Sequence, residues 1–227
     1  MSKHLLVGCS FTDPMWQEDV PWSVEFSKTH PSYIVAKAGM GIKGITTEAM
    51  YYLKGIPDIS TCVIMLPSLW RMDIEMSQDS EVCNAMVDLL ECGVGGCRNK
   101  ERATRKWIVS GGVHYDKKTK AGKIFNPMYK HQGFLVILKE HIRSLKILID
   151  YCRRSSINYY ISAITDPMEQ LLHCDMRGEE TKLLEEVEYS NWFRFDGKFV
   201  DGFLSHDKHP STEEHVVLSE YIIRNIL

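Results

Sequence analysis

The sequence predicts an α/β protein with a mostly parallel sheet that is covered by helices on both faces. Short apolar runs typical of buried strands alternate along the chain with segments that have the apolar spacing of helices. Strands that are apolar throughout indicate a parallel sheet, because crossover helices then shield both of its sides. At 227 residues the chain is long enough for one substantial domain, and we expect residues 1–227 to form a single one.

The first two strands and the helix between them are predicted near the N-terminus. Residues 4–8, HLLVG, form an apolar run that ends at glycine, as a buried strand does where it enters a loop. A helix is expected within residues 21–30, because a proline suits its first turn and Pro31 prevents its continuation. Residues 32–39 have the pattern of the second strand.

The next helix and the third strand follow directly. The helix is expected to begin near Thr46 or Thr47 and to end at Gly55. Residues 61–68 are apolar as far as Pro67, which predicts a buried strand that ends there.

Two helices and one strand are predicted in the second half of the chain. Residues 132–156 have the spacing of one long amphipathic helix, and residues 158–164 have the pattern of the next strand. The last helix is expected to begin at a capping box formed by Ser211 and Glu214. Its predicted apolar stripe consists of Val217, Leu218, Tyr221, Ile222 and Ile226.

The composition excludes several classes of protein. Hydrophobic residues make up 44% of the chain and charged residues 25%, as in ordinary globular proteins. The longest aliphatic and aromatic run, residues 134–138, is too short to cross a bilayer, and no secretory apolar region begins the chain. We therefore expect a cytoplasmic protein without a membrane partner. Seven cysteines, odd in number and scattered through apolar segments, predict free thiols.

A basic insertion is expected at about residues 92–131. It is interpreted as a solvated excursion or, alternatively, as a lid over the site that favours an acidic or phosphorylated substrate. A nucleic-acid partner is a third interpretation, which the net charge of −3 argues against. Its basic residues are Arg98, Lys100, Arg102, Arg105, Lys106, Lys117, Lys118, Lys120 and Lys123.

The loops at the carboxyl ends of the predicted strands carry residues suited to catalysis. Ligands of open parallel sheets bind outside these ends, where Ser10, the glycine turn 39–44 and the turn 67–71 are expected to meet. His209 precedes the last helix, two residues after Asp207. An imidazole can take a serine proton near neutral pH, and a carboxylate on its other nitrogen fixes the tautomer.

These blocks resemble the SGNH (GDSL-type) hydrolase superfamily. The chain has a glycine-x-serine turn at Gly8–Ser10, a glycine turn after the second strand, and an Asp/His-Pro-Ser loop before the last helix, in that order. The resemblance covers nearly the whole chain. It implies a flavodoxin-like three-layer α/β/α sandwich with a five-stranded sheet in the order 2-1-3-4-5. It also implies ester hydrolysis without a cofactor, with Ser10 as nucleophile, His209 as base and Asp207 as the acid.

The resemblance also implies an oxyanion hole. Its donors would be the backbone N–H groups of Ser10 and Gly44. The third block, LPSLWRMD, lacks the family's asparagine, and Ser68 or Arg71 is expected to replace it. Arg71 would instead suit an anionic substrate group through its bidentate fork, and Trp70 is expected to contact the substrate.

The chain departs from the family's pattern at two further positions. Cys9 replaces the aspartate of the first block, and His206 stands where the family has its acid, so that Asp207 lies one residue closer to His209. Either Asp207 orients His209 or a backbone carbonyl does. Such departures recur in short branches of the superfamily that include phage-encoded proteins.

Each candidate residue has a competing interpretation. Ser10 is also a plausible turn residue, and Cys9 beside a histidine would be a competent nucleophile. We favour Ser10, because adjacent residues of extended chain point in opposite directions. The histidines and the aspartate at 206–215 lack the spacing of a helical ligand pair, and no metal is expected there.

The expected substrate is a small-molecule or carbohydrate ester. The alternative function is a binding protein for a small or anionic ligand, in which the fold persists and the oxyanion hole has decayed.

Overall fold

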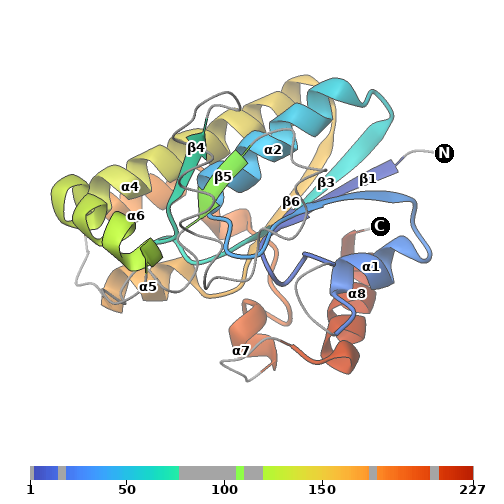
Figure 1. The fold of residues 1–227 in the computed structure, drawn as a ribbon. Helices are drawn as coiled ribbons and strands as arrows, with labels where there is room; N and C mark the ends of the chain where they lie inside the picture. The colour runs from blue at the N-terminus through green and yellow to red at the C-terminus, as the bar shows by residue number, and fades with distance from the viewer. Residues whose placement is uncertain are drawn as a thin grey trace.

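The computed structural model has a central four-stranded sheet between two layers of helices (Figure 1). This arrangement confirms the predicted fold class. The structure describes residues 3–14, 19–76, 106–109, 120–173, 178–204 and 210–226.

The strands of the sheet are those that the apolar runs predict. In spatial order they are β2 (Ser32–Ala36), β1 (Lys3–Gly8), β3 (Ile59–Leu66) and β6 (Asn158–Ala163), and all neighbouring pairs are parallel. The central strands β1 and β3 are almost entirely buried, as strands covered on both faces must be. The order of the four agrees with the first four positions that the resemblance implies.

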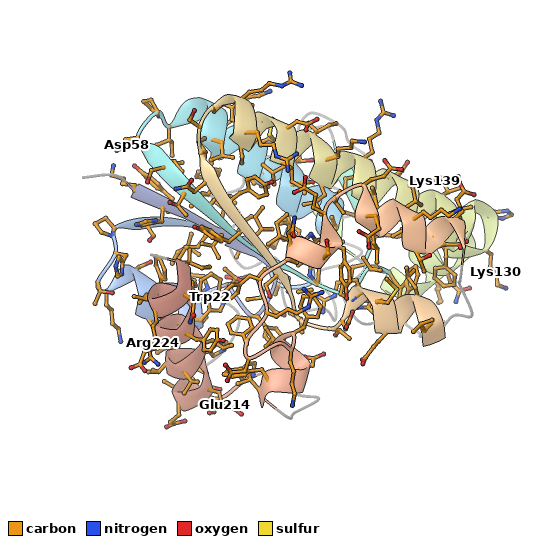
Figure 2. The ribbon with its side chains drawn as sticks, turned by 180° about the vertical axis from the view of Figure 1, so that it is seen from behind. Trp22, Asp58, Lys130, Lys139, Glu214 and Arg224 are labelled. Atoms are coloured by element: carbon orange, nitrogen blue, oxygen red, sulfur yellow. The ribbon has the colours of Figure 1, made fainter. Side chains whose placement is uncertain are left out.

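Two helices cover each face of the sheet (Figure 1). Helices α2 (Ile42–Gly55) and α4 (Lys120–Arg154) pack together on one face, and α1 (Trp22–Ser27) and α8 (Thr212–Ile226) pack together on the other. Figure 2 shows their side chains filling the space against the sheet, with the fully buried Trp22 beside α8. Within the described helices, none has an apolar stretch long enough to span a bilayer.

The remaining elements are short. Strands β4 and β5 pair antiparallel in a separate sheet, and the segment after β6 is mostly helical. These elements are β4 (Asp73–Met76), β5 (Lys106–Val109), α5 (Pro167–His173), α6 (Glu179–Glu185), the 3₁₀ helix η1 (Tyr189–Asn191) and α7 (Val200–Leu204).

The expected fifth strand is wrong for the described part of the chain, where the central sheet has four strands. The segment beside the outer edge of β6 contributes one backbone bond to it, from Phe193 N–H to the Ile161 carbonyl at 2.7 Å. That segment includes the 3₁₀ helix η1, and Glu188 before it has a left-handed backbone with φ of 55°. Such a backbone interrupts the extended geometry that a strand requires.

Ion pairs connect α4 to the segment that covers this edge. Cations spaced seven residues apart along α4 each pair with a glutamate from residues 179–188. Exposed pairs of this kind stabilise a protein by up to about 1 kcal/mol each. The pairs are Lys139–Glu179 at 2.6 Å, Lys146–Glu186 at 3.2 Å and Arg153–Glu188.

The long helix expected over residues 132–156 is confirmed from residue 134 to Arg154. Gly133 has φ of 70° and ψ of 155°, which are not helical, so α4 consists of two helices joined at a kink. Helix then continues on the N-terminal side back to Lys120, which lies inside the predicted basic insertion. The apolar positions used to predict the helix begin at residue 134, so they gave no signal for the part before it.

The predicted capping box begins α8. Ser211 N–H donates to Glu214 Oε2 at 2.8 Å, and Glu214 N–H donates to Ser211 Oγ at 3.4 Å. Of the predicted stripe, Leu218 and Ile222 are fully buried, but the inclusion of Val217 was wrong, because 47% of that residue is exposed.

Gly8 ends β1 at a position where a side chain has no room. A Cβ atom there would lie 2.1 Å from Thr12 Oγ1 and 3.2 Å from the carbonyl oxygen of Met65. At Gly55, in the last turn of α2, no atom lies within 4 Å of the corresponding position.

We predict that Gly8→Ala lowers the free energy of unfolding by about 1–3 kcal/mol, because Thr12 must move out of its packed position. Gly55→Ala is the matched control, and it should leave stability unchanged or raise it by up to about 1 kcal/mol. Urea unfolding of the three proteins measures both effects. Equal stability of the two variants would contradict the steric argument.

Candidate active site

Ser10 lies in a tight turn directly after β1. The N–H groups of Thr12 and Asp13 both donate to the Cys9 carbonyl, at 2.9 and 3.0 Å. Ser10 Oγ lies 4.0 Å from Cys9 Sγ, and Ser10 is 3% exposed. The expectation that Cys9 and Ser10 point in opposite directions is wrong, because a turn replaces the extended chain that it assumed.

Two hydrogen bonds hold this turn to neighbouring elements. Ala38 N–H, just after β2, donates to Asp13 Oδ2 at 2.9 Å. Ser23 Oγ in α1 donates to the Thr12 carbonyl at 2.6 Å. The Ser10 turn is therefore fixed against both the end of β2 and the helix layer on one face of the sheet.

Asp73 joins the loop after β3 to the start of α2. Its two carboxylate oxygens accept N–H bonds from Gly41 and Gly44, both at 2.8 Å. Burial raises the pKa of Asp73 to about 6, although these bonds and the nearby charges of Arg71 and Lys37 act to lower it. Asp73 thus acts as a helix cap supplied from a different part of the chain.

This cap explains why α2 begins at Ile42, four residues before the expected Thr46. A sequence search for a helix start relies on a local capping side chain, and none is present at Gly41. The Asp73 carboxylate takes that role across the fold. A Cβ at Gly44 would lie 2.8 Å from Asp73 Oδ2, so glycine also allows the close approach.

The same bond changes the expected role of Gly44. Its N–H was predicted to bind the oxyanion, but in this structure it donates to a buried carboxylate. One N–H group makes one strong hydrogen bond, so Gly44 is not free to donate to a substrate while Asp73 holds it.

Ser68 is also engaged inside the protein. Its hydroxyl donates to Gln170 Oε1 at 2.8 Å, and the same oxygen accepts the N–H of Leu69 at 2.9 Å. Ser68 Oγ in turn accepts the N–H of Trp70 at 3.3 Å. These bonds order the loop after β3. The Ser68 hydroxyl already donates to Gln170, so in this structure it is not available to donate to a substrate oxyanion.

Trp70 and Arg71 follow in the same loop and differ in exposure. Trp70 is 6% exposed and packs against Phe134 of α4 with 4.7 Å between ring centroids, so it is part of the core and not a cleft wall. Arg71 is half-buried. Its carbonyl oxygen lies 2.4 Å from where a Cβ at Gly41 would be, which places the loop directly against the start of α2.

His141 of α4 contacts the loop after β3. It hydrogen-bonds the backbone of Leu69, and it is 3% exposed. Burial lowers the pKa of His141 to about 4, so the imidazole is neutral at pH 7.

The predicted base and acid, His209 and Asp207, lie outside the described residues, as does His206. The structure does describe the start of α8 that follows them. Thr212 Oγ1 donates to Asp19 Oδ1 at 3.0 Å and accepts the N–H of Val20 at 3.3 Å. The chain just after His209 is thus attached to the segment between the Ser10 turn and α1.

Most of the predicted lid also lies outside the described residues. Of its basic side chains, the structure describes that of Lys123, which is exposed. Among the described residues, no group of three or more histidine, cysteine, aspartate or glutamate side chains could hold a metal ion.

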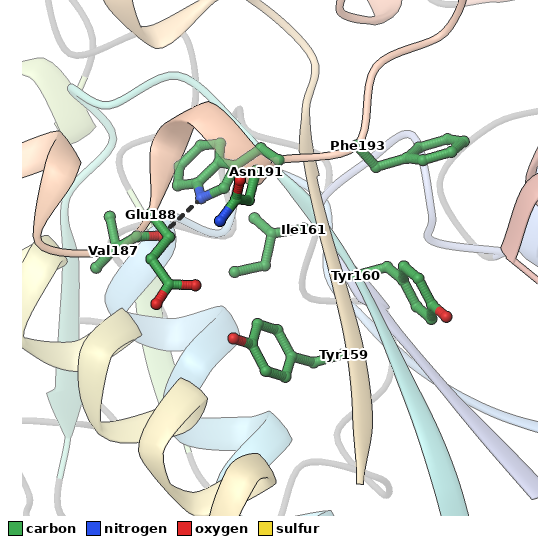
Figure 3. Close-up of a pocket in the computed structure, with 8 residues that line it drawn as sticks. Tyr159, Tyr160, Ile161, Val187, Glu188, Asn191 and Phe193 are labelled. Atoms are coloured by element: carbon green, nitrogen blue, oxygen red, sulfur yellow. Dashed lines mark hydrogen bonds between the residues drawn. The ribbon is translucent and has the colours of Figure 1, made fainter.

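A hollow of about 300 Å³ lies elsewhere, at the outer edge of β6 (Figure 3). It is lined by residues of that strand, among them Tyr159, and by residues of the segment 187–193. None of the predicted site residues lines it, and β3 separates β6 from the strand that carries Ser10. We do not count it as part of the candidate site.

Comparison with solved structures identifies a protein of the same fold. The chain is similar to a catalytic mutant of Axe2, an acetylxylan esterase from Geobacillus stearothermophilus, with a TM-score of 0.50 and 11% identity. The match covers 98% of this chain and 93% of that one. The two proteins share a fold. No protein-family model and no curated protein matches the chain.

Three buried side chains that organise the site were not found from the sequence. These are Asp13, Asp73 and Gln170, each of which accepts a backbone N–H from a different segment. Asp73 closes the third block quoted above, so the block itself was a signal. Nothing in the local pattern around Gln170 indicates that it binds a loop a hundred residues away.

We predict that Asp73 makes stability depend on pH. Its ordinary pKa is 3.8 and its folded pKa is about 6, so the folded state holds the proton more tightly and stability falls as the pH rises through this window. The unfolding free energy of wild type minus that of Asp73→Asn should decrease by about 2 kcal/mol from pH 4 to pH 6.5. Urea unfolding across this range tests it, and a constant difference would contradict the buried carboxylate.

His141 should produce the opposite slope. Its folded pKa of about 4 lies below the ordinary 6.5, so the stability it contributes is present above pH 6.5 and is lost as the pH falls toward 4. We expect His141→Gln to lose less stability than wild type over that range, by about 3 kcal/mol. Parallel curves for the two proteins would show that the imidazole is solvated.

Proposed function

We propose that the protein is a serine-dependent ester hydrolase. Ser10 Oγ attacks the ester carbonyl carbon, and His209 takes the hydroxyl proton and returns it to the leaving alcohol. Water then attacks the acyl-Ser10 ester with the same histidine as base, releasing the carboxylic acid and restoring Ser10. Asp207 holds the imidazole in the required tautomer. The reaction needs no cofactor.

The position of Ser10 carries this proposal. It stands in the turn after the central strand β1, at the edge of a parallel sheet where ligands of such folds bind. The blocks that resemble SGNH hydrolases stand in the family's order around it, and a solved esterase shares the fold. The substrate class that this suggests is a small acyl ester, and acetylated sugars are the first compounds to try.

The contacts of α8 support the role of His209. Thr212 bonds to Asp19 and Val20, in the segment that connects the Ser10 turn to α1. His209 precedes Thr212 by three residues in the sequence, and three residues of chain span at most about 11 Å. The proposal requires the imidazole of His209 to reach the Ser10 turn from there.

The oxyanion hole differs from the one that the resemblance implies. Ser10 N–H is retained as a donor in our proposal, whereas Gly44 is bonded to Asp73. We expect the second donor to be Ile42 or Lys43. Their N–H groups lie in the first turn of α2, where helical amides have no partner within the helix. One such donor is typically worth about 3 kcal/mol of transition-state stabilisation.

A binding protein without turnover is the second candidate function. Two of the three expected oxyanion donors, Gly44 and Ser68, are engaged in internal hydrogen bonds, and Ser10 itself is 3% exposed. This arrangement favours a protein that keeps the fold and retains a ligand. The two candidates differ in whether Ser10 is chemically activated.

We predict that a serine-directed fluorophosphonate forms one covalent adduct with the wild type, measured by intact-mass spectrometry. The adduct should persist in Cys9→Ala and be absent in Ser10→Ala. In His209→Ala the rate of labelling should fall by about a thousandfold, because the proton acceptor is lost.

Circular dichroism confirms that each variant is folded before labelling. No adduct on folded wild type would favour the binding protein. An adduct that persists in Ser10→Ala but disappears in Cys9→Ala would identify the thiol as the nucleophile instead.

A further inference from the structure

The outer edge of β6 presents backbone groups of alternate residues. In a parallel strand the N–H and C=O of one residue point to the same edge, and the next residue points to the other edge. Ile164 N–H donates to the Leu66 carbonyl of β3, whereas the Ile161 carbonyl accepts Phe193 N–H on the opposite side. The backbone groups of Tyr159 and Ile161 therefore face the outer edge.

Most of these edge groups are unpaired. Among the residues that the structure describes, no backbone carbonyl accepts the N–H of Tyr159 or Ile161, and no backbone N–H donates to the Tyr159 carbonyl. Ile161 is 3% exposed, and buried backbone donors are normally hydrogen-bonded. A ligand that supplies both an acceptor and a donor would satisfy this edge.

The hollow at the outer edge of β6 gives a ligand access to these groups. Its volume of about 300 Å³ is that of a small ligand site, and Tyr159 and Ile161 are among its lining residues (Figure 3). Glu188 and Asn191 line it from the neighbouring segment. Asn191 is exposed and Tyr159 is half-buried, so the hollow opens to solvent.

The wall opposite β6 is held in place by hydrogen bonds. Trp192 Nε1 donates to the Val187 carbonyl at 3.0 Å, and Trp192 N–H donates to the Tyr189 carbonyl at 3.1 Å. Phe193 N–H joins the end of this wall to Ile161 at 2.7 Å. The hollow is therefore formed before a ligand binds, which lowers the entropy cost of binding.

The charges at the hollow are paired. Glu188 forms an ion pair with Arg153 of α4, and the Arg153 guanidinium also lies 5.7 Å from the centroid of the Tyr159 ring. Val187 and Trp192, both buried, supply apolar lining. Such a lining favours a neutral ligand, because an unpaired charge would lose its hydration there without gaining a partner.

We propose that this hollow binds a neutral, extended peptide segment of another protein, which adds to the outer edge of β6 at the position of a fifth strand. One extended residue presents its N–H and C=O on the same side, so it can donate to the Tyr159 carbonyl and accept from Ile161 N–H. A single amide group does not match this edge, because its N–H and C=O point in opposite directions. The inference does not depend on the proposed hydrolase function.

Two blocked amino acids that differ by one methyl group test the proposal. N-acetylvaline methylamide has both groups of an extended residue, whereas its analogue methylated on the valine nitrogen cannot donate to the Tyr159 carbonyl. Valine suits the test because β-branched residues favour extended backbone. In NMR titrations of isotope-labelled protein, we expect the first compound to shift the Tyr159 and Ile161 amide signals saturably. The analogue should bind about tenfold or more weakly.

Asn191→Trp tests whether the hollow is the binding site. Asn191 is exposed at the rim, so a larger side chain there should fill the hollow without disturbing the core. We expect this variant, checked for folding by circular dichroism, to lose the shifts. Glu185→Trp is the matched control, because Glu185 is exposed in α6 and does not line the hollow. It should bind like wild type.

Three results would overturn the inference. The first is the absence of amide shifts, or equal affinity of the two compounds. The second is binding of maltose but not of N-acetylvaline methylamide, which would assign the hollow to a sugar. The third is a dimer in sedimentation that Asn191→Trp abolishes, which would identify a second copy of this chain as the occupant. Because binding alone is measured, a failure here is distinct from a failure of hydrolysis at Ser10.

Discussion

The loops at the carboxyl ends of the strands depend on one interaction, the binding of the Asp73 carboxylate to the start of α2. It lies at the start of β4, yet it accepts the N–H groups of Gly41 and Gly44 at the beginning of α2. These bonds fix where α2 begins and hold the loop after β3 against the loop after β2. Glycine is required at both positions because the carboxylate and the Arg71 backbone approach too closely for a side chain. The shape of the candidate site follows from this one cap.

The strands and the last helix were predictable because their signals are local. An apolar run without a break specifies β1 or β3, and the Ser211 and Glu214 pair specifies the start of α8. The start of α2 was not predictable in this way, because its cap is more than thirty residues away in the chain. Within the described residues the central sheet has four strands for a similar reason, since the segment with η1 and the left-handed Glu188 is bonded to α4 and β6, which are distant from it in the chain.

For the site, the sequence was sufficient to locate the loops after β1 and β3, but it was insufficient to identify what the side chains of these loops contact. Ser10 stands in the predicted turn after β1, and the residues from Ser68 to Arg71 stand in the predicted turn after β3. The bonding of each side chain is a property of the folded molecule. Ser68 bonds to Gln170, and Trp70 packs on Phe134. A small polar residue in a loop looks the same in sequence whether it faces a substrate or its own protein, so these roles required the structure.

These hydrogen bonds change which groups are expected to stabilise the oxyanion. With Gly44 and Ser68 engaged inside the protein, the account relies on Ser10 N–H and on the remaining amides at the start of α2.

A crystal structure of the protein after reaction with a fluorophosphonate tests this account most directly. The account predicts a phosphonyl group on Ser10 Oγ, with its oxygen accepting Ser10 N–H and an amide of Ile42 or Lys43, while Gly44 stays bonded to Asp73. A phosphonyl oxygen bound by Gly44, with the Asp73 carboxylate displaced, would contradict it.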